Sequence, residues 1–371
     1  MNITPFQAIY PKVDLITSPE SFFDSLKYQF NEFYKSGFFD KSPQESLYIY
    51  RIKNKLTSLT SIGLVCSTSV EDLINNKILK HEKTLAAKEQ QMMRLILQRQ
   101  SYIKPVLLTY PDVMPLNKFL EKITMESDPF MSLSFDSEDV DHELWKISDG
   151  AKIEKVRKIF ETKIKSAYVA DGHHRCSTTQ ILYSSKELDN AAQKFSSIFT
   201  VYFPESHLLI WDFNRVVEIL DQVSVVSLIT KLSQICKIKE LKRGRKPKKK
   251  FEMTMFVKNN WYSLKWKKKV LEKFKDESVL LDVKLFNQYV LNEICNIVNV
   301  RADSRITYFS GKPGVKVLEE QVKKSSKKIA FAFYPVHASE LMTIADKLET
   351  LPPKSTFFEP RMKNGVLSME F

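Results

Sequence analysis

The sequence predicts an α+β protein in which helices and strands are mixed along the whole chain. Apolar residues recur at helical spacing in some segments and alternate in others, and short turn-forming stretches separate the two patterns. The chain has 371 residues, of which 43% are hydrophobic. This length suffices for about two domains, and this composition can bury a sizeable core. We therefore expect a folded mixed α/β protein and not a disordered one.

The first segments predict strands around one amphipathic helix. Apolar residues at helical spacing indicate a helix over 19–30, and Ser18 stands where an N-cap is expected. Alternation in 47–53 predicts a strand, and 56–67 is expected to be its antiparallel partner. A short helix then begins after Ser69, with an acid at its third position as in a capping box.

The middle of the chain again contains predicted helices and strands in turn, and its last part is predicted to be a strand, a turn and a helix. A long helix is expected to end near Arg99, a strand follows over 102–110, and a helix covers 153–165. That helix leads into the apolar strand end at 168–170. Residues 199–213 are typical of a hairpin that turns around Pro-Glu-Ser.

The composition becomes rich in lysine after about residue 218, which predicts a domain boundary there. We expect a main α/β domain over 1–218, a lysine-rich α+β subdomain over 219–300, and a C-terminal α/β segment over 301–371 that packs back on the core. The remaining expected elements are helices at 226–236, 283–296, 315–323 and 339–348, strands at 251–257, 261–266, 306–309 and 329–334, and a loop over 351–371.

The net charge of +13 invites a nucleic-acid interpretation, but the charge is concentrated in one run. Residues 237–250, KIKELKRGRKPKKK, carry nine basic residues and one acid, which leaves +5 for the rest of the chain. Glycine and proline inside the run favour a solvated hairpin tip. Contact with RNA or DNA through 237–250 is the alternative that we do not favour.

Cysteine usage and hydropathy indicate a cytoplasmic protein. The four cysteines are far apart and show no CxxC spacing, which argues against a zinc ribbon or a disulfide framework and fits a reducing compartment. The first ten residues hold no apolar run of the length that a signal peptide needs. No stretch of about 18 apolar residues occurs, so we expect no membrane span.

The most informative segment is Asp171-Gly172-His173-His174-Arg175, between a strand end and a predicted helix. The glycine allows a sharp turn, and the free N–H groups and dipole of the helix start favour an anion. The arginine can add a planar fork for phosphate or carboxylate, and the aspartate is a candidate metal ligand or base. The alternative is an ordinary polar turn with a histidine that fills a core gap. Four functional side chains in five residues exceed what a turn needs.

A second candidate segment is Lys80-His81-Glu82-Lys83-Thr84, which precedes the long helix. Glu82 can serve as a general base, and an acid or hydroxyl near a helix start can bind a metal or phosphate. An exposed charged turn with a helix cap is the competing interpretation. Walker A, GxGxxG and HExxH patterns are all missing from the sequence, which disfavours P-loop, Rossmann and zincin enzymes.

Five motifs together resemble a large bacterial and archaeal family, domain of unknown function 1015. The similarity runs from Pro5 to Gly365 and is weakest over about 235–270. The motifs are Lys80–Thr84 with Lys88-Glu89, His142 with Trp145, Ala170–Arg175, Asn214–Val217 and Pro352–Pro360. The Asp-Gly-His-His-Arg motif is also similar to that of free-serine kinases in the ParB and sulfiredoxin superfamily, where it holds nucleotide phosphates. ParB itself binds CTP with a related turn.

The resemblance implies a ParB/sulfiredoxin-like core with a second α+β region. It also implies roles for named residues: Asp171, His173, His174 and Arg175 would contact phosphates or Mg²⁺, with Asp171 as the metal ligand. We further expect Glu82 to be the catalytic base, with His81 and Asp171 as the other catalytic residues and with Lys88 nearby. Gly172, Ser177 and Lys88 would complete the phosphate and nucleotide site. The residue after the arginine is commonly aromatic in the family, whereas Cys176 stands here.

We therefore expect a nucleotide-dependent phosphotransferase that acts on a small hydroxylated metabolite such as serine, with ATP, ADP or CTP and Mg²⁺. This requires Glu82 and Asp171 to approach each other although 89 positions separate them. One alternative is a ParB-like nucleotide-binding or DNA-associated regulator without enzyme activity. Another is a metal-dependent phosphate-ester hydrolase that uses the same acid and histidines.

Overall fold

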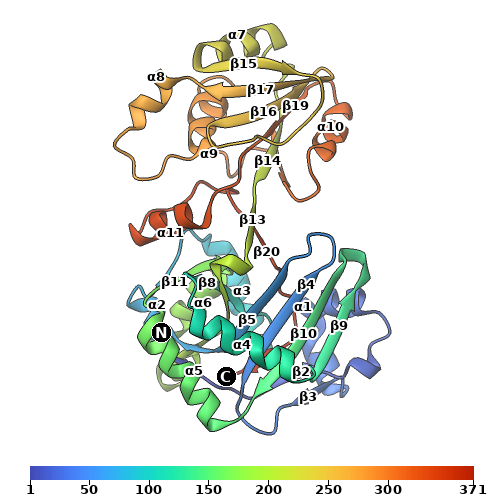
Figure 1. Cartoon of the computed structure of the whole chain (residues 1–371), viewed down its shortest axis with the longest axis vertical. Coiled ribbons are helices and arrows are strands. Elements are labelled where there is room, and N and C mark those ends of the chain that lie inside the picture. The colour runs from blue at the N-terminus through green and yellow to red at the C-terminus, as the bar shows by residue number, and fades with distance from the viewer. The chain divides into compact units, whose positions relative to one another are not determined.

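The chain folds into two compact units, drawn in Figure 1. The computed structural model describes the backbone of residues 1–371 and the side chains of residues 1–185 and 191–371. The first unit comprises Met1–Leu209 and Pro360–Phe371, and the second comprises Ile210–Glu359. This division differs from the expected three parts, because residues 301–359 pair with strands of the second unit and only 360–371 return to the first.

A large mixed sheet forms the centre of the first unit. β4 and β5 pair antiparallel, which confirms the predicted pair, and β8 lies between β11 and β12. The strand order is β6-β11-β8-β12-β5-β4-β10-β9, with β1 paired to β5. The bounds are β1 Ile3–Thr4, β4 Leu47–Asn54, β5 Thr60–Ser69, β6 Ile78–Leu79, β8 Val106–Tyr110, β9 Met131–Phe135, β10 Val140–Ile147, β11 Ala167–Asp171 and β12 Ser197–Pro204.

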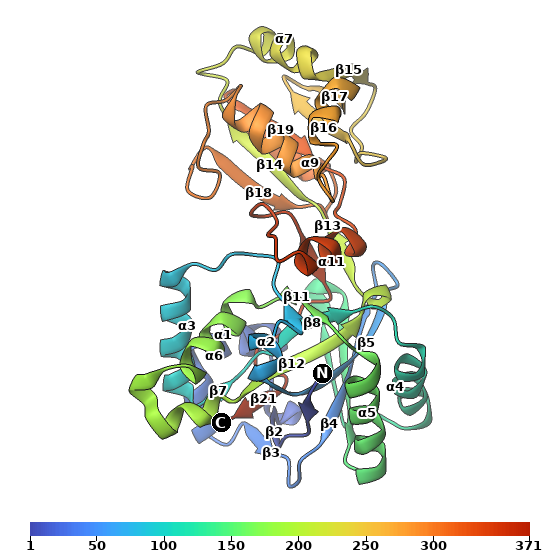
Figure 2. The same ribbon diagram turned by 90° about the vertical axis from the view of Figure 1, so that its left-hand side faces the viewer.

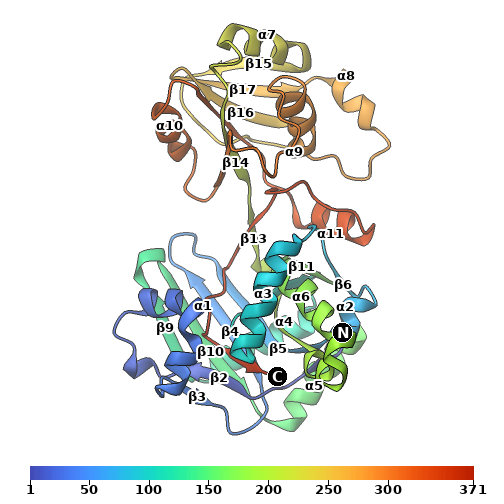
Figure 3. The same cartoon turned by 180° about the vertical axis from the view of Figure 1, so that it is seen from behind.

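Helices cover both faces of this sheet, with α4 and α5 on one face and α1 and α3 on the other (Figures 1 and 3). Leu116 and Leu120 of α4 and Phe160 of α5 are buried in one cluster with sheet residues such as Leu64 and Leu108. The bounds are α1 Pro19–Lys35, α2 Val70–Ile74, α3 Ala86–Arg99, α4 Met114–Glu126, α5 Gly150–Lys163 and α6 His173–Tyr183.

Two predicted helix starts differ in their capping. Ser69 accepts a hydrogen bond from the N–H of Glu71 at 3.3 Å, as expected of an N-cap. Ser18 precedes α1 at the predicted position, but its side chain makes no capping hydrogen bond among the described residues. The proline that follows it at the first helical position has no N–H to cap and already has a helical φ.

A smaller sheet of the first unit joins the two ends of the chain. Its order is β3 (Phe39–Lys41), β2 (Ala8–Pro11), β21 (Ser368–Glu370) and β7 (Ser101–Tyr102), so the C-terminal strand lies between β2 and β7 (Figure 2). The prediction of a loop over 351–371 was therefore wrong for β20 (Phe357–Glu359) and β21. Both strands depend on partners far away in sequence, which local patterns do not reveal.

The predicted hairpin over 199–213 is also wrong. β12 pairs with β5 on one edge and β8 on the other, so neither edge is left for the next strand. β13 (Leu209–Trp211) pairs instead with β20.

The second unit contains a sheet in the order β15-β17-β16-β19-β14-β18. Phe286, Val290, Met255 and Phe331 belong to its main core. The helix expected at 283–296 is α9 followed by a π-helical segment at Phe286–Asn292. The other bounds are β14 Phe213–Glu218, α7 Val225–Ile235, β15 Cys236–Leu241, β16 Glu252–Val257, β17 Asn260–Trp266, α8 Lys268–Leu271, α9 Asp282–Leu285, β18 Ile306–Ser310, α10 Lys316–Lys323, β19 Lys328–Ala332 and α11 Ala338–Asp346.

The basic run 237–250 is largely solvated, as expected, but it is not a hairpin tip. Its first part is β15, which pairs with β17 and not with β16. Arg245 forms an ion pair with the buried Glu252 at 2.6 Å, and Lys250 forms one with Glu340. The Lys246 ammonium lies 4.4 Å from the centre of the Trp211 ring. These three side chains have partners within the unit, whereas the other six basic residues of the run are exposed.

Two further predictions concern the chain as a whole. All four cysteines are buried and unbridged in the described structure. Among the described residues, no helix combines the length and apolar character needed to cross a bilayer.

Candidate functional site

The turn between β11 and α6 depends on Gly172. This residue has φ +109°, and its carbonyl accepts a hydrogen bond from the N–H of Cys176 at 3.0 Å. A Cβ at this position would lie 2.8 Å from Nη2 and 2.9 Å from Nε of Arg175. Glycine is therefore required both for the left-handed backbone and for the close approach of the guanidinium. The predicted strand, sharp turn and helix are all present.

Arg175 fastens this turn to the segment that precedes β8. Its Nη1 donates to the carbonyl oxygens of Lys104 at 3.1 Å and Pro105 at 2.6 Å, and its Nη2 donates to Asp171 Oδ2 at 2.7 Å. The side chain is only 12% exposed. The fork that the sequence assigned to phosphate is thus largely occupied by acceptors of the protein itself.

The Asp171 carboxylate is half exposed and remains ionised. Loss of water around it opposes ionisation, but the positive charges of Arg175 and Lys104 outweigh this and lower its pKa. The residues with described side chains include no group of three or more histidine, cysteine, aspartate and glutamate side chains that could hold an ion.

His173 is buried and faces Glu82. Its Nε2 accepts the backbone N–H of His81 at 3.4 Å, so the ring proton belongs on Nδ1, which lies 3.9 Å from Glu82 Oε2. Burial lowers the pKa of His173 to about 3, so the ring is neutral near pH 7. His173 cannot supply positive charge to a phosphate, and its neutral ring borders the Glu82 carboxylate, whose side chain is 36% exposed.

His81, expected as a catalytic residue, is only 1% exposed. Its ring packs edge-to-face against His173, with the centroids 4.4 Å apart. Burial and the neighbouring His173 hold its pKa well below the usual value. The His81 ring therefore lies inside the protein against His173, and it is not exposed to a ligand.

The next side chains of α6 fasten the segment before α3. His174 Nε2 accepts the N–H of Leu85, the N-cap residue of α3, at 3.2 Å. Burial and the nearby charge of Lys88, which is exposed on α3, lower the pKa of His174. Ser177 Oγ lies 3.4 Å from Thr84 Oγ1. Segment 81–85 is therefore held against the start of α6 by successive side chains of the motif.

The structure thus brings together residues that the sequence separates. Glu82 lies beside His173, with 3.9 Å between Oε2 and Nδ1, and His173 follows Asp171 by two positions in the chain. The four motif side chains do not enclose one hollow, however. His173 points to Glu82, His174 to Leu85, and Arg175 to Lys104 and Pro105, because successive helical residues project about 100° apart.

Sequence reasoning missed Lys104. Burial and the charge of Arg175 lower its pKa to about 8, and Asp171 opposes that shift. The expected strand over 102–110 in fact breaks into β7 and β8 around Lys104 and Pro105. A lysine followed by proline inside an apolar run was the available signal, because proline interrupts a strand ladder.

The comparison with protein families gives one match. The family described as "Protein of unknown function (DUF1015)" matches residues 6–284. The chain belongs to this family. The DUF1015 match includes segment 80–85, the β11–α6 turn and Lys104, and it ends within the second unit. No curated protein matches the chain.

Several solved structures show distant likeness. SbnI with a C-terminal truncation, from Staphylococcus aureus, has a TM-score of 0.41 and 14% identity over 81% of this chain and 85% of its own. A conserved hypothetical protein from Pyrococcus furiosus has a TM-score of 0.37 and 12% identity, over 81% of this chain and 93% of its own. A mutant free serine kinase in complex with ADP has a TM-score of 0.39 and 10% identity, over 81% of this chain and 92% of its own. At these TM-scores the likenesses assign no activity or ligand to this chain.

Proposed function

We propose that this DUF1015 protein transfers a phosphoryl group from a nucleotide to the hydroxyl of a small metabolite such as serine. The observation that carries the proposal is the position of Glu82, a partly exposed carboxylate held beside the start of α6. A base and an anion-binding helix terminus are thereby adjacent. The likeness of the Asp171–Arg175 motif to that of free-serine kinases supports the same assignment, with a ParB/sulfiredoxin-like core as part of it.

The proposed step uses the residues as follows. Phosphate oxygens lie against the first-turn N–H groups of α6, where the helix dipole favours negative charge. Glu82 accepts the proton of the substrate hydroxyl while that oxygen bonds to phosphorus and the bridging oxygen of the nucleotide leaves with its electron pair. His173 borders Glu82, and the exposed Lys88 offers positive charge nearby. Positioning and charge neutralisation of this kind provide most of the catalysis in phosphoryl transfer.

The residues present fit a magnesium ion that arrives with the nucleotide. Mg²⁺ commonly takes one or two carboxylates and completes its shell with phosphate oxygens and water. Asp171 is half exposed and ionised, so it can serve as that single protein ligand. When bound, the ion would neutralise part of the phosphate charge. The proposal places the reaction in the cytoplasm, which suits the unbridged cysteines.

The experiment measures transfer and binding separately. The purified protein is incubated with serine, MgCl₂ and either ATP, ADP or CTP, and phosphoserine is quantified by mass spectrometry. Nucleotide binding is measured by calorimetry. We expect Glu82→Gln to lower the rate by about 10²- to 10⁴-fold, because a general base is lost, with little change in nucleotide affinity.

Glu126→Gln is the matched control, because that carboxylate is exposed on α4 and pairs only with Lys122 in the described structure. It should keep the wild-type rate. Wild-type turnover by Glu82→Gln, or failure of all three nucleotides to bind, would refute the proposal.

A further inference from the structure

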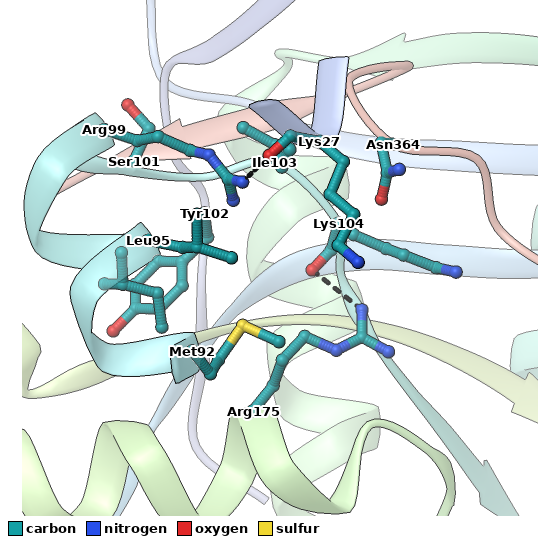
Figure 4. A pocket seen from close by; sticks show the side chains of 11 residues that line it. Lys27, Met92, Leu95, Arg99, Ser101, Tyr102, Ile103, Lys104, Arg175 and Asn364 are labelled. Atoms are coloured by element: carbon teal, nitrogen blue, oxygen red, sulfur yellow. Dashed lines mark hydrogen bonds between the residues drawn. The ribbon is translucent and has the colours of Figure 1, made fainter. Parts of the chain in front are cut away.

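Arg175 also lines a cavity of about 220 Å³ in the first unit. The walls come from α1, α3, α6, the connection between β7 and β8, and the C-terminal segment near Asn364 (Figure 4). None of the proposed catalytic groups Glu82, His173 or Asp171 lines it. The cavity is therefore a separate feature of the molecule that shares only Arg175 with the β11–α6 turn.

The polar part of this cavity is basic. Lys27, Arg99, Lys104 and Arg175 line it, and none of its lining residues, all with described side chains, is acidic. The Asp171 carboxylate pairs with Arg175 but does not line the cavity. Arg99 itself donates a hydrogen bond to the Lys27 carbonyl, which joins α3 to α1 at the cavity wall. The surrounding charge attracts an anion and repels a cation.

The opposite part of the cavity is apolar. Figure 4 shows Met92, Leu95 and Tyr102 on one side and Lys104 and Arg175 on the other. A ligand that fills the cavity therefore meets hydrocarbon and cationic groups at the same time. An ordinary buried polar cavity would present neither the apolar wall nor the excess of positive charge.

We propose that this cavity binds a small organic anion, with its carboxylate or phosphate toward Lys104 and Arg175 and its compact apolar body against Met92, Leu95 and Tyr102. The volume decides the size class. A cavity of about 150 Å³ holds benzene, whereas drug-sized ligands need about 300 to 1,000 Å³. A benzene-sized acid fits this volume. A free amino acid is disfavoured because its ammonium group would meet four cationic side chains.

Lys104 gives the proposal a second signature. Its pKa is lowered to about 8 by burial and by Arg175, with smaller contributions from Arg361 and Lys363, while Asp171 acts in the opposite direction. Lys27 and Arg99 face the same cavity from α1 and α3. A bound anion favours the charged ammonium and raises this pKa. Binding near pH 8 should therefore take up about half a proton, and binding near pH 6.5 almost none.

The test uses benzoate as the probe, titrated into the full-length protein without nucleotide. Calorimetry at pH 8 in two buffers with different ionisation enthalpies gives both the affinity and the proton uptake. We expect benzoate or phenyl phosphate to bind at least about tenfold more tightly than benzamide, benzylamine or inorganic phosphate. The first two ligands distinguish a carboxylate site from a phosphate site. Equal affinity for benzamide, or for inorganic phosphate, would overturn the proposal.

Variants separate the charge from the shape of the site. Lys104→Met removes a partly buried charge among other cations and should preserve the fold. It should abolish proton uptake and weaken benzoate binding by about tenfold or more. Leu95→Trp should block the cavity without changing its charge. Leu56→Trp is its control, because Leu56 is exposed in the same unit and distant in sequence from the cavity.

Benzoate binding does not depend on the proposed phosphotransferase activity, so the two proposals can fail separately. Glu82→Gln should bind benzoate like the wild type, since Glu82 does not line the cavity. Unchanged benzoate binding by both Lys104→Met and Leu95→Trp would show that the ligand binds elsewhere and would refute the inference.

Discussion

The guanidinium of Arg175 occupies the space in which a side chain at Gly172 would stand. Nη2, Nε and Cζ all lie within 3.0 Å of an ideal Cβ at that position. From there the same group reaches the carbonyls of Lys104 and Pro105 and the carboxylate of Asp171. Gly172 and Arg175 therefore depend on each other. Because Gly172 has no side chain, the Arg175 guanidinium can occupy the position from which it makes these contacts.

Gly172→Ala should therefore destabilise α6 by more than the backbone strain alone. Alanine at φ +109° costs about 1 to 2 kcal/mol, and displacement of the guanidinium breaks hydrogen bonds worth a similar amount. We expect a loss of about 2 to 4 kcal/mol in the opening free energy of α6, measured by hydrogen exchange of peptides over 167–183.

Gly37→Ala is the matched control. Gly37 has φ +80°, and a Cβ added there would meet no atom within 4 Å. This substitution should therefore lower the local opening free energy only by the cost of backbone strain. In an Arg175→Met background, Gly172→Ala should also fall to this smaller cost. Equal losses at both glycines in the wild-type background would contradict the account.

Arg175→Lys should destabilise the turn more than Asp171→Asn. Lysine cannot reach three acceptors at once, so buried carbonyls lose their donors, and we expect about 2 to 3 kcal/mol. Asp171 is half exposed, so its ion pair is screened and its loss should cost about 1 kcal/mol or less. Hydrogen exchange of peptides over 167–183 measures both losses. A larger loss for Asp171→Asn than for Arg175→Lys would indicate that the ion pair stabilises the turn more than the hydrogen bonds to the carbonyls do.

The stability of the protein should fall in mild acid, and His142 should account for part of the fall. Its Nδ1 lies 2.6 Å from the Tyr50 hydroxyl, and burial lowers its pKa to about 3. The folded pKa lies below the unfolded value near 6.5, so this contribution is complete above pH 6.5 and is lost as the pH falls toward 3. Between pH 7 and pH 5 the loss is about 2 kcal/mol for this residue.

His142→Gln should reduce the difference between urea unfolding at pH 7 and pH 5 by about that amount, because glutamine keeps an acceptor and does not titrate. Buried His81 and His173 should leave a residual pH dependence in the variant. An unchanged difference would mean that His142 is protonated in the folded protein.

Arg245→Met should destabilise the second unit. Glu252 is 1% exposed and is bound by Arg245, by the Lys248 N–H at 3.1 Å and by the Ser263 hydroxyl at 2.6 Å. Removal of the guanidinium leaves a buried carboxylate without its counter-charge, and we expect a loss of about 3 kcal/mol in urea unfolding. Arg243→Met, an exposed change of the same type in the same run, should cost less than about 0.5 kcal/mol.

Regular elements with strong local patterns were predictable from the sequence. The helix over 19–30, the strand pair at 47–67 and the strand–turn–helix at 167–183 all appear, because periodicity and turn residues are local signals. The partners of β13, β20 and β21 were not, because pairing with strands far away along the chain leaves no local trace. For the same reason the three-part division misplaced residues 301–359.

The candidate site shows the same limit at the level of side chains. The sequence indicated Asp171, Gly172 and Glu82 from residue type and spacing, but it could not reveal what each side chain contacts. The acceptors of Arg175 are backbone carbonyls, which every residue has, so no residue type identifies Lys104 and Pro105 as its partners. The burial of His81 likewise follows from the fold around it and not from its neighbours in sequence.

The central position of β21 between β2 and β7 has a consequence for biosynthesis. The first unit lacks one of its inner strands until residues 360–371 leave the ribosome, whereas Ile210–Glu359 is translated in full before then. The first unit, although its synthesis begins earlier, can therefore be completed only after the whole second unit has been synthesised. This differs from the usual N-terminal-first sequence of domain folding.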